Sequence, residues 1–170
     1  MGDQAKKREF PVNTVHVIRT AQQIHVMLSQ MADQKANILL AATFVIFTIA
    51  IGQVRDMAEP LPLLILGGGA FFSAIFAVLA VVPAANYRAG GPINLLFFGS
   101  FSQLDEEAYL DRVVETIGDE EAAFRLMLRD LYQNGLVLER KKYRLLGYAY
   151  RIFLAGLVAS FIAFVAGYFV

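Results

Sequence analysis

The chain has 170 residues, of which 57% are hydrophobic, and its mean hydropathy is +0.52. This composition is too apolar for a soluble domain of that length and places the protein in a membrane. Its 15 basic and 15 acidic residues give a formal net charge of zero. The complete lack of cysteine excludes disulfide bonds, thiol nucleophiles and cysteine-ligated zinc sites.

Three runs without a charged residue predict three membrane-spanning helices. These runs are residues 36–54, 60–87 and 152–170, and about 18 to 20 apolar residues are enough to cross the hydrocarbon core of a bilayer. We therefore expect an all-α integral membrane protein with a helical cytoplasmic module. The expected parts are an N-terminal amphipathic helix (1–35), a first span (36–54), a second span (61–84), a cytoplasmic loop and helical hairpin (85–150), and a third span (151–170).

The positions of lysine and arginine predict the orientation of these spans. Five basic residues precede the first span and nine lie between the second and third, whereas Arg55 alone lies between the first and second. Because basic loops stay on the cytoplasmic side, we expect a cytoplasmic N-terminus and an external C-terminus. The first 35 residues contain no uninterrupted apolar core, so we expect no cleaved signal peptide and a retained first span.

An apolar seam precedes the first span. Val17, Ala21, Ile24, Leu28 and Met31 recur at alternating steps of four and three residues, the spacing of one face of a helix. This N-terminal seam predicts a helix from about Thr14 that continues into the first span and packs against another helix. The partner is either the second cytoplasmic helix of the same chain or a second copy of the protein.

The segment between the second and third spans predicts a helical hairpin. Ser102, with Asp105 three residues later, resembles a capping box, and the first helix should end at Gly118, where a left-handed stop is tolerated. From Glu120 the only breaker is Gly135, so we expect one long helix that continues into the third span. A heptad seam on this helix is interrupted at Gly135 and Lys142 and comprises Phe124, Leu128, Leu131, Leu138, Leu145, Ala149 and Ile152.

Charge divides this hairpin into an acidic half, residues 104–121, and a basic half, residues 125–151. One interpretation is that the halves pair with each other and that the basic residues nearest the membrane anchor to lipid head groups. The other is that some basic side chains bind a phosphate. Asp33 and Lys35 stand at the edge of the first span, with Lys35 as an interfacial anchor and Asp33 as its counter-charge.

The sequence predicts a face for helix packing in the spans but no catalytic or metal-binding pattern. In the second span Gly69, Ser73 and Ala77 follow one another at four-residue steps, which allows close approach of another helix. His16 and His25 are nine residues apart, on opposite sides of a helix, and do not form the i, i+4 pair of a metal site. We expect neither an enzyme nor a bound metal.

Three motifs occur in a fixed order relative to the spans. The pattern DxKAxxLL at residues 33–40 precedes the first span, PINLLFFGSF at 92–101 with EEAY at 106–109 follows the second, and DLY at 130–132 with KKYRLL at 141–146 precedes the third. In this arrangement the chain resembles the Pycsar-type bacterial antiphage transmembrane effectors, formerly a domain of unknown function. The resemblance covers most of the chain, from about Ala32 to the last span.

The resemblance implies a homo-oligomeric membrane effector. It would recognise a cyclic pyrimidine mononucleotide, cyclic CMP or cyclic UMP, made by a cognate cyclase during infection, and then impair the inner membrane; no nucleic-acid polymer is expected as a partner. In that hypothesis the candidate ligand residues are Arg125, Arg129 and Lys142 for the phosphate and Tyr87, Tyr109 or Tyr132 for stacking on the base. Asn94 is a further candidate ligand residue.

The apolar loop, residues 93–98, would tuck under the helical module or against the inner leaflet with Asn94 facing inward, and would couple this module to the spans. An alternative makes the loop an interfacial plug without a ligand. A second class of function also stays open, a constitutive membrane scaffold or accessory subunit that docks a partner through the N-terminal seam.

Overall fold

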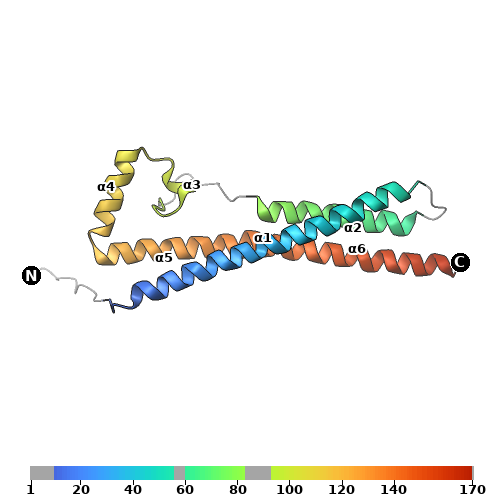
Figure 1. Ribbon diagram of the computed structural model, residues 1–170, viewed down its shortest axis with the longest axis horizontal. Helices are drawn as coiled ribbons and strands as arrows, with labels where there is room; N and C mark the ends of the chain where they lie inside the picture. The colour runs from blue at the N-terminus through green and yellow to red at the C-terminus, as the bar shows by residue number, and fades with distance from the viewer. Residues whose placement is uncertain (1–9, 56–59, 83–92, 170) are drawn as a thin grey trace, which may run out of the picture. The chain divides into compact units, whose positions relative to one another are not determined.

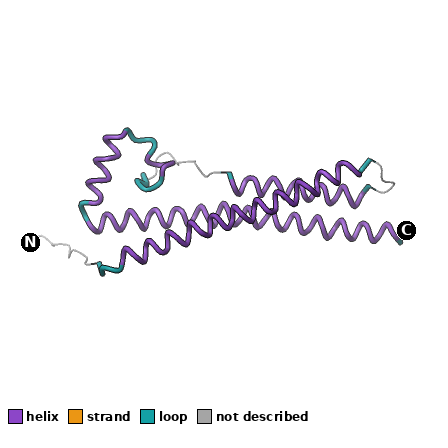
Figure 2. The backbone as a smooth tube through the Cα atoms, viewed as in Figure 1, coloured by secondary structure: helices purple, strands orange, loops and turns teal. Residues whose placement is uncertain are grey.

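The computed structural model describes residues 10–55, 60–82 and 93–169, and these residues are helical apart from short loops (Figures 1 and 2). The elements in chain order are α1 (Thr14–Gln53), α2 (Leu61–Val81), α3 (Phe98–Phe101), α4 (Glu106–Ile117), α5 (Glu120–Val137), the π-helical segment η1 (Leu138–Tyr143) and α6 (Arg144–Tyr168). No strand occurs among the described residues. The predicted all-α fold is confirmed.

Three of the described helices are long and apolar enough to cross a membrane, as the sequence predicts. They are Thr14–Gln53, Leu61–Val81 and the continuous helix Glu120–Tyr168 that α5, η1 and α6 form together. The helix continues through Gly135, where an added Cβ would lie 3.1 Å from Cε1 of His25. The glycine therefore makes room for an imidazole and does not end the helix.

The chain divides into two compact units. Met1–Met27 and Ala84–Leu136 form the first, which we call the polar unit, and Leu28–Pro83 and Val137–Val170 form the second, which we call the spanning unit. The polar unit contains α3, α4, α5 and the start of α1, whereas the spanning unit contains α2, η1, α6 and the rest of α1.

In the spanning unit α2 packs closely against α6 through small residues. A Cβ added at Gly69 would lie 2.9 Å from the Cα of Gly156, and the hydroxyl of Ser73 donates a hydrogen bond of 2.8 Å to the carbonyl oxygen of Ala149. Ser73 and Ala77 are completely buried. The small-residue packing face predicted for the second span is therefore confirmed, and α6 is its partner.

The buried core of the spanning unit is made mostly of alanine and leucine. Alanine at a crossing point lets backbones approach within van der Waals distance, which is how helices associate in lipid. Two clusters bring α1, α2 and α6 together, and their members are Ala32, Ala36, Ala80 and Leu146 in one and Leu39, Ala77 and Ala149 in the other.

The N-terminal seam does not pack inside the chain as a unit. Val17, Ile24 and Met31 are 69%, 46% and 43% exposed, whereas Ile18 and Ala32, each one residue further along, are buried. One residue corresponds to about 100° of rotation around a helix. The buried face of α1 is thus a neighbouring face rich in small and polar residues, which the apolar periodicity does not detect.

Three local expectations in the hairpin are wrong. Asp105, not Ser102, caps α4 by accepting a 3.0 Å hydrogen bond from the backbone N–H of Ala108, and Ser102 instead ends α3. Gly118 ends α4 as expected, but with φ −68° and ψ −19° it is right-handed. Leu128 of the predicted heptad seam is half exposed, whereas the buried residues of α5 are Phe124, Leu126 and Asp130.

Candidate functional site

A buried carboxylate organises the polar unit. Asp130 of α5 is 8% exposed and accepts hydrogen bonds from three neutral amides: Gln22 Nε2 at 3.3 Å, Asn94 Nδ2 at 3.1 Å and Asn134 Nδ2 at 3.0 Å. A buried charge is costly unless it is hydrogen-bonded. The three amides provide those bonds from α1, from the apolar loop and from α5 itself.

Asn94 fixes the apolar loop to this centre. Its side chain is 1% exposed, donates to Asp130 and to Gln133 Oε1 at 2.9 Å, and accepts from the N–H of Leu96 at 3.0 Å. Its own N–H donates to Ser100 Oγ at 2.8 Å. The prediction that Asn94 faces inward is confirmed, and the residue serves as a structural anchor for the loop.

Tyr109 of α4 also contacts this part of the chain. Its ring lies 4.8 Å from that of Phe101, and its hydroxyl donates to the carbonyl oxygen of Leu95 at 3.4 Å. Leu95 is buried, whereas Leu96 and Phe98 are about half exposed or more. The loop therefore packs one side on the helices of the polar unit and presents the other outward.

Three of the residues that the sequence singles out lie on one exposed face of α5. Arg125, Arg129 and Tyr132 follow at steps of four and three residues and are all exposed, which places them on a common helical face. Arg125 is paired with Glu121 at 2.6 Å one turn earlier. This face combines two guanidinium groups, which suit a phosphate, with an exposed phenol ring.

Lys142 belongs to the spanning unit and has a different environment. Its ammonium donates to both carboxylate oxygens of Asp33, at 2.7 and 2.6 Å, and to Ser29 Oγ at 2.7 Å. The expectation that Lys35 is the counter-charge of Asp33 is thus replaced by a pair between α1 and η1. Tyr87, the remaining candidate, lies outside the described residues.

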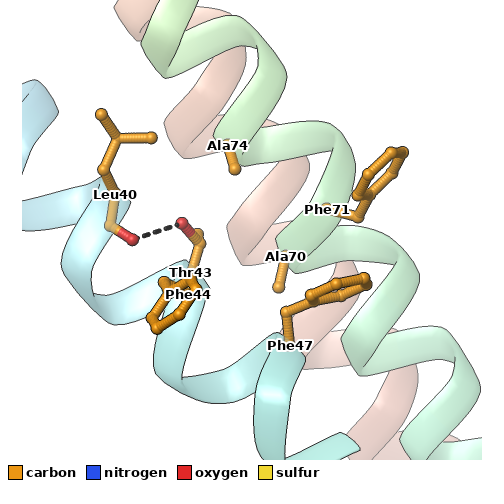
Figure 3. A pocket seen from close by; sticks show the side chains of 7 residues that line it. All are labelled: Leu40, Thr43, Phe44, Phe47, Ala70, Phe71 and Ala74. Atoms are coloured by element: carbon orange, nitrogen blue, oxygen red, sulfur yellow. Dashed lines mark hydrogen bonds between the residues drawn. The ribbon is translucent and has the colours of Figure 1, made fainter. Parts of the chain in front are cut away.

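The spanning unit also contains an apolar groove between α1 and α2 (Figure 3). It has a volume of about 240 Å³ and is lined by Leu40, Thr43, Phe44, Phe47, Ala70, Phe71 and Ala74. The hydroxyl of Thr43 is directed to the carbonyl oxygens of Leu39 and Leu40, at 2.8 and 3.0 Å, so the groove wall offers no free hydroxyl donor. These side chains suit hydrocarbon and not a charged nucleotide.

Sequence reasoning missed Asp130, Gln22, Gln133 and Asn134. The signal that could have found part of this cluster is the spacing of Asp130 and Asn134, two polar residues one helical turn apart on α5, where their side chains form a hydrogen bond. In a chain as rich in apolar residues as this one, a polar residue that faces the interior indicates a hydrogen-bonded cluster.

Comparison with known proteins identifies the family. No curated protein and no solved structure matches the chain. The family described as PycTM, Pycsar effector protein domain, matches residues 16–167 and so covers the three membrane-capable helices, apart from the outermost residues of the first and last, together with the polar unit's hairpin. The chain therefore belongs to the Pycsar effector family, whose members are membrane effectors of antiphage defence.

Proposed function

We propose that this protein is an inner-membrane effector that a cyclic pyrimidine mononucleotide triggers and that then impairs the membrane of the infected cell. The match to the Pycsar effector family over residues 16–167 is the observation that carries the proposal. The protein acts as a homo-oligomer and by a conformational change, not by catalysis. The trigger is cyclic CMP or cyclic UMP from a cognate cyclase.

The exposed face of α5 is the nucleotide site in this proposal. The cyclic phosphate carries one negative charge, and Arg125 and Arg129 offer guanidinium groups that bind phosphate oxygens through charge-assisted hydrogen bonds. Tyr132 is 66% exposed, and Leu128 lies on the same face and is 49% exposed. A pyrimidine ring can stack on the phenol while the aliphatic side chain covers its edge.

Calorimetry of the full-length protein in lipid nanodiscs tests this site. Cyclic CMP and cyclic UMP should give saturable binding, and cyclic AMP should not. Arg125→Gln with Arg129→Gln should weaken binding by at least about tenfold, since a hydrogen bond to a charged group contributes about 1.5 to 3 kcal/mol. Arg112→Gln, an exposed arginine of α4, is the matched control and should bind as the parent does.

Binding that survives the double replacement would contradict the assignment of the site. A protein that binds no cyclic nucleotide, either in detergent or in nanodiscs, would instead remove the ligand-gated function itself.

The proposed orientation has a cytoplasmic N-terminus and an external C-terminus. The chain contains no cysteine, so single introduced thiols report their side of the membrane without background. Val12→Cys should react with a membrane-impermeant maleimide only after spheroplasts are opened, and Phe169→Cys should react while they are intact. Both positions are more than 80% exposed. Labelling in the reverse order would overturn the orientation.

The exposed residues of the N-terminal seam favour one alternative, a constitutive membrane scaffold that docks a partner there. Expression in bacteria separates the two functions. An effector should be tolerated alone and toxic when its cyclase is co-expressed, whereas a scaffold should be harmless in both cases.

A further inference from the structure

The ammonium group of Lys142 has no donor left for a ligand. An ammonium carries three protons, and its three acceptors are the two carboxylate oxygens of Asp33 and the hydroxyl of Ser29, all within 2.7 Å. The side chains of Lys142 and Asp33 are 19% and 36% exposed. The pair is therefore partly withdrawn from solvent and joins α1 directly to η1.

The residues on either side of Lys142 make similar connections within the spanning unit. Lys141 Nζ donates to the carbonyl oxygen of Val82, at the end of α2, at 2.7 Å, and the hydroxyl of Tyr143 donates to the carbonyl oxygen of Leu28 of α1 at 3.3 Å. Three consecutive residues of η1 thus hold the other two membrane-capable helices.

The π-helical form of η1 is what aligns these contacts. Leu138 and Leu146 are buried, and Lys142, midway between them, points to α1. In a regular α-helix two four-residue steps would turn the face by about 80°. A π-helical turn contains more residues than an α-turn and keeps the three positions on one side. Such segments are rare and occur frequently at functional sites.

We propose that the contacts of Lys142 with Asp33 and Ser29 form a latch that holds η1 in the π-helical register. When these contacts break, η1 returns to α-helix and the helix register shifts. Each residue of that shift rotates α6 against α2 by roughly 100°. This inference rests on the proposed function in one respect. The rotation of α6 is the change in the spans that impairs the membrane. It assigns Lys142 to gating rather than to binding the nucleotide.

The position of α6 against α2 gives a readout that needs no nucleotide. Ser73 Oγ lies 2.8 Å from the carbonyl oxygen of Ala149, and both residues are completely buried. Ser73→Cys with Ala149→Cys in the cysteine-free chain should form a disulfide when oxidised in vesicles of phosphatidylethanolamine and phosphatidylglycerol. Adding Asp33→Asn or Lys142→Gln should lower the disulfide yield several-fold, because α6 has rotated.

The matched control is Glu139→Gln, which breaks an exposed ion pair with Arg140 inside the same segment and should leave the yield unchanged. Unchanged yields in both latch variants would overturn the proposal. Should either variant fail to insert, Ser29→Ala decides, since it removes one acceptor without stranding a charge and should lower the yield partially. Exchange of the charges, Asp33→Lys with Lys142→Asp, should restore part of the yield.

Dye release from the same vesicles separates this inference from the function on which it builds. The latch variants, without the added cysteines, should release dye in the absence of nucleotide while the parent protein does not. A reduced disulfide yield without dye release would support the latch and contradict the effector function. Dye release with an unchanged yield would contradict the latch.

Discussion

At the scale of single residues, Asn94 is the contact on which the apolar loop depends. Its replacement by leucine removes both donated hydrogen bonds and leaves Asp130 and Gln133 each short of a partner. An unsatisfied buried group costs about 1 to 3 kcal/mol. We therefore expect Asn94→Leu to lower the thermal unfolding midpoint by several degrees and to make residues 93–105 sensitive to limited proteolysis.

The control for this change is Gln103→Leu, because Gln103 is an exposed amide near the same loop whose hydrogen bond to the carbonyl oxygen of Gly99 is long, at 3.5 Å. It should behave as the parent protein does. Equal protease resistance of Asn94→Leu and the parent would show that the packing of Leu95 and Tyr109, and not the amide, holds the loop.

The charged partner of Asp33 shows what local sequence reasoning cannot reach. Lys35 is the nearest basic residue along the chain, but on a helix a side chain two positions away points to a different face. The actual partner, Lys142, is 109 residues away. Asp130 is comparable, because its donors include Gln22 and Asn94, which only the folded chain brings to it.

At the scale of helices, the contact of α2 with α6 depends on two glycines. A methyl group added at Gly69 would lie 2.9 Å from the backbone of Gly156, whereas one at the adjacent Gly68 would meet nothing within 4 Å. Backbone atoms cannot move aside as a flexible side chain can. We expect Gly69→Ala to lower the free energy of unfolding by about 1 to 3 kcal/mol and Gly68→Ala to leave it unchanged or slightly raised.

Thermal denaturation in a mild detergent measures both glycine variants side by side. On α6, Gly147 has nothing within 4 Å of an added Cβ, so Gly147→Ala and Gly156→Ala repeat the comparison from the other helix. Equal midpoints for the two members of either pair would mean that the helices separate easily at this crossing.

The sequence predicts where helices form more directly than it predicts where a helix departs from regular α-helical turns. Length and the lack of charge predict the spans, and α1 begins at Thr14 and α5 at Glu120 as expected. The π-helical segment could not be predicted, since Leu138 to Tyr143 contains ordinary helix-forming residues. The segment coincides with tertiary contacts that the local sequence does not reveal, those of Lys141, Lys142 and Tyr143 with the other two membrane-capable helices.

At the scale of the whole molecule, α1 carries two faces with inverted character. A helix of a soluble protein turns its apolar face inward, but here Gln22, Ser29 and Ala32 make internal contacts while Val17 and Ile24 are exposed. Exposed apolar residues at heptad spacing on a helix that leads into a membrane span favour association with a parallel helix.

We therefore expect two copies of the chain to meet through Val17, Ile24 and Met31. Insertion in the same direction makes their first helices parallel, and the seven-residue spacing then places each residue opposite its own copy. Ile24→Cys should form a covalent dimer on mild oxidation in native membranes. Arg19→Cys, which is exposed on α1 but about 140° around the helix from Ile24, should not. Equal cross-linking at the two positions would mean that the copies only collide, and the apolar face would then be the site of a different partner.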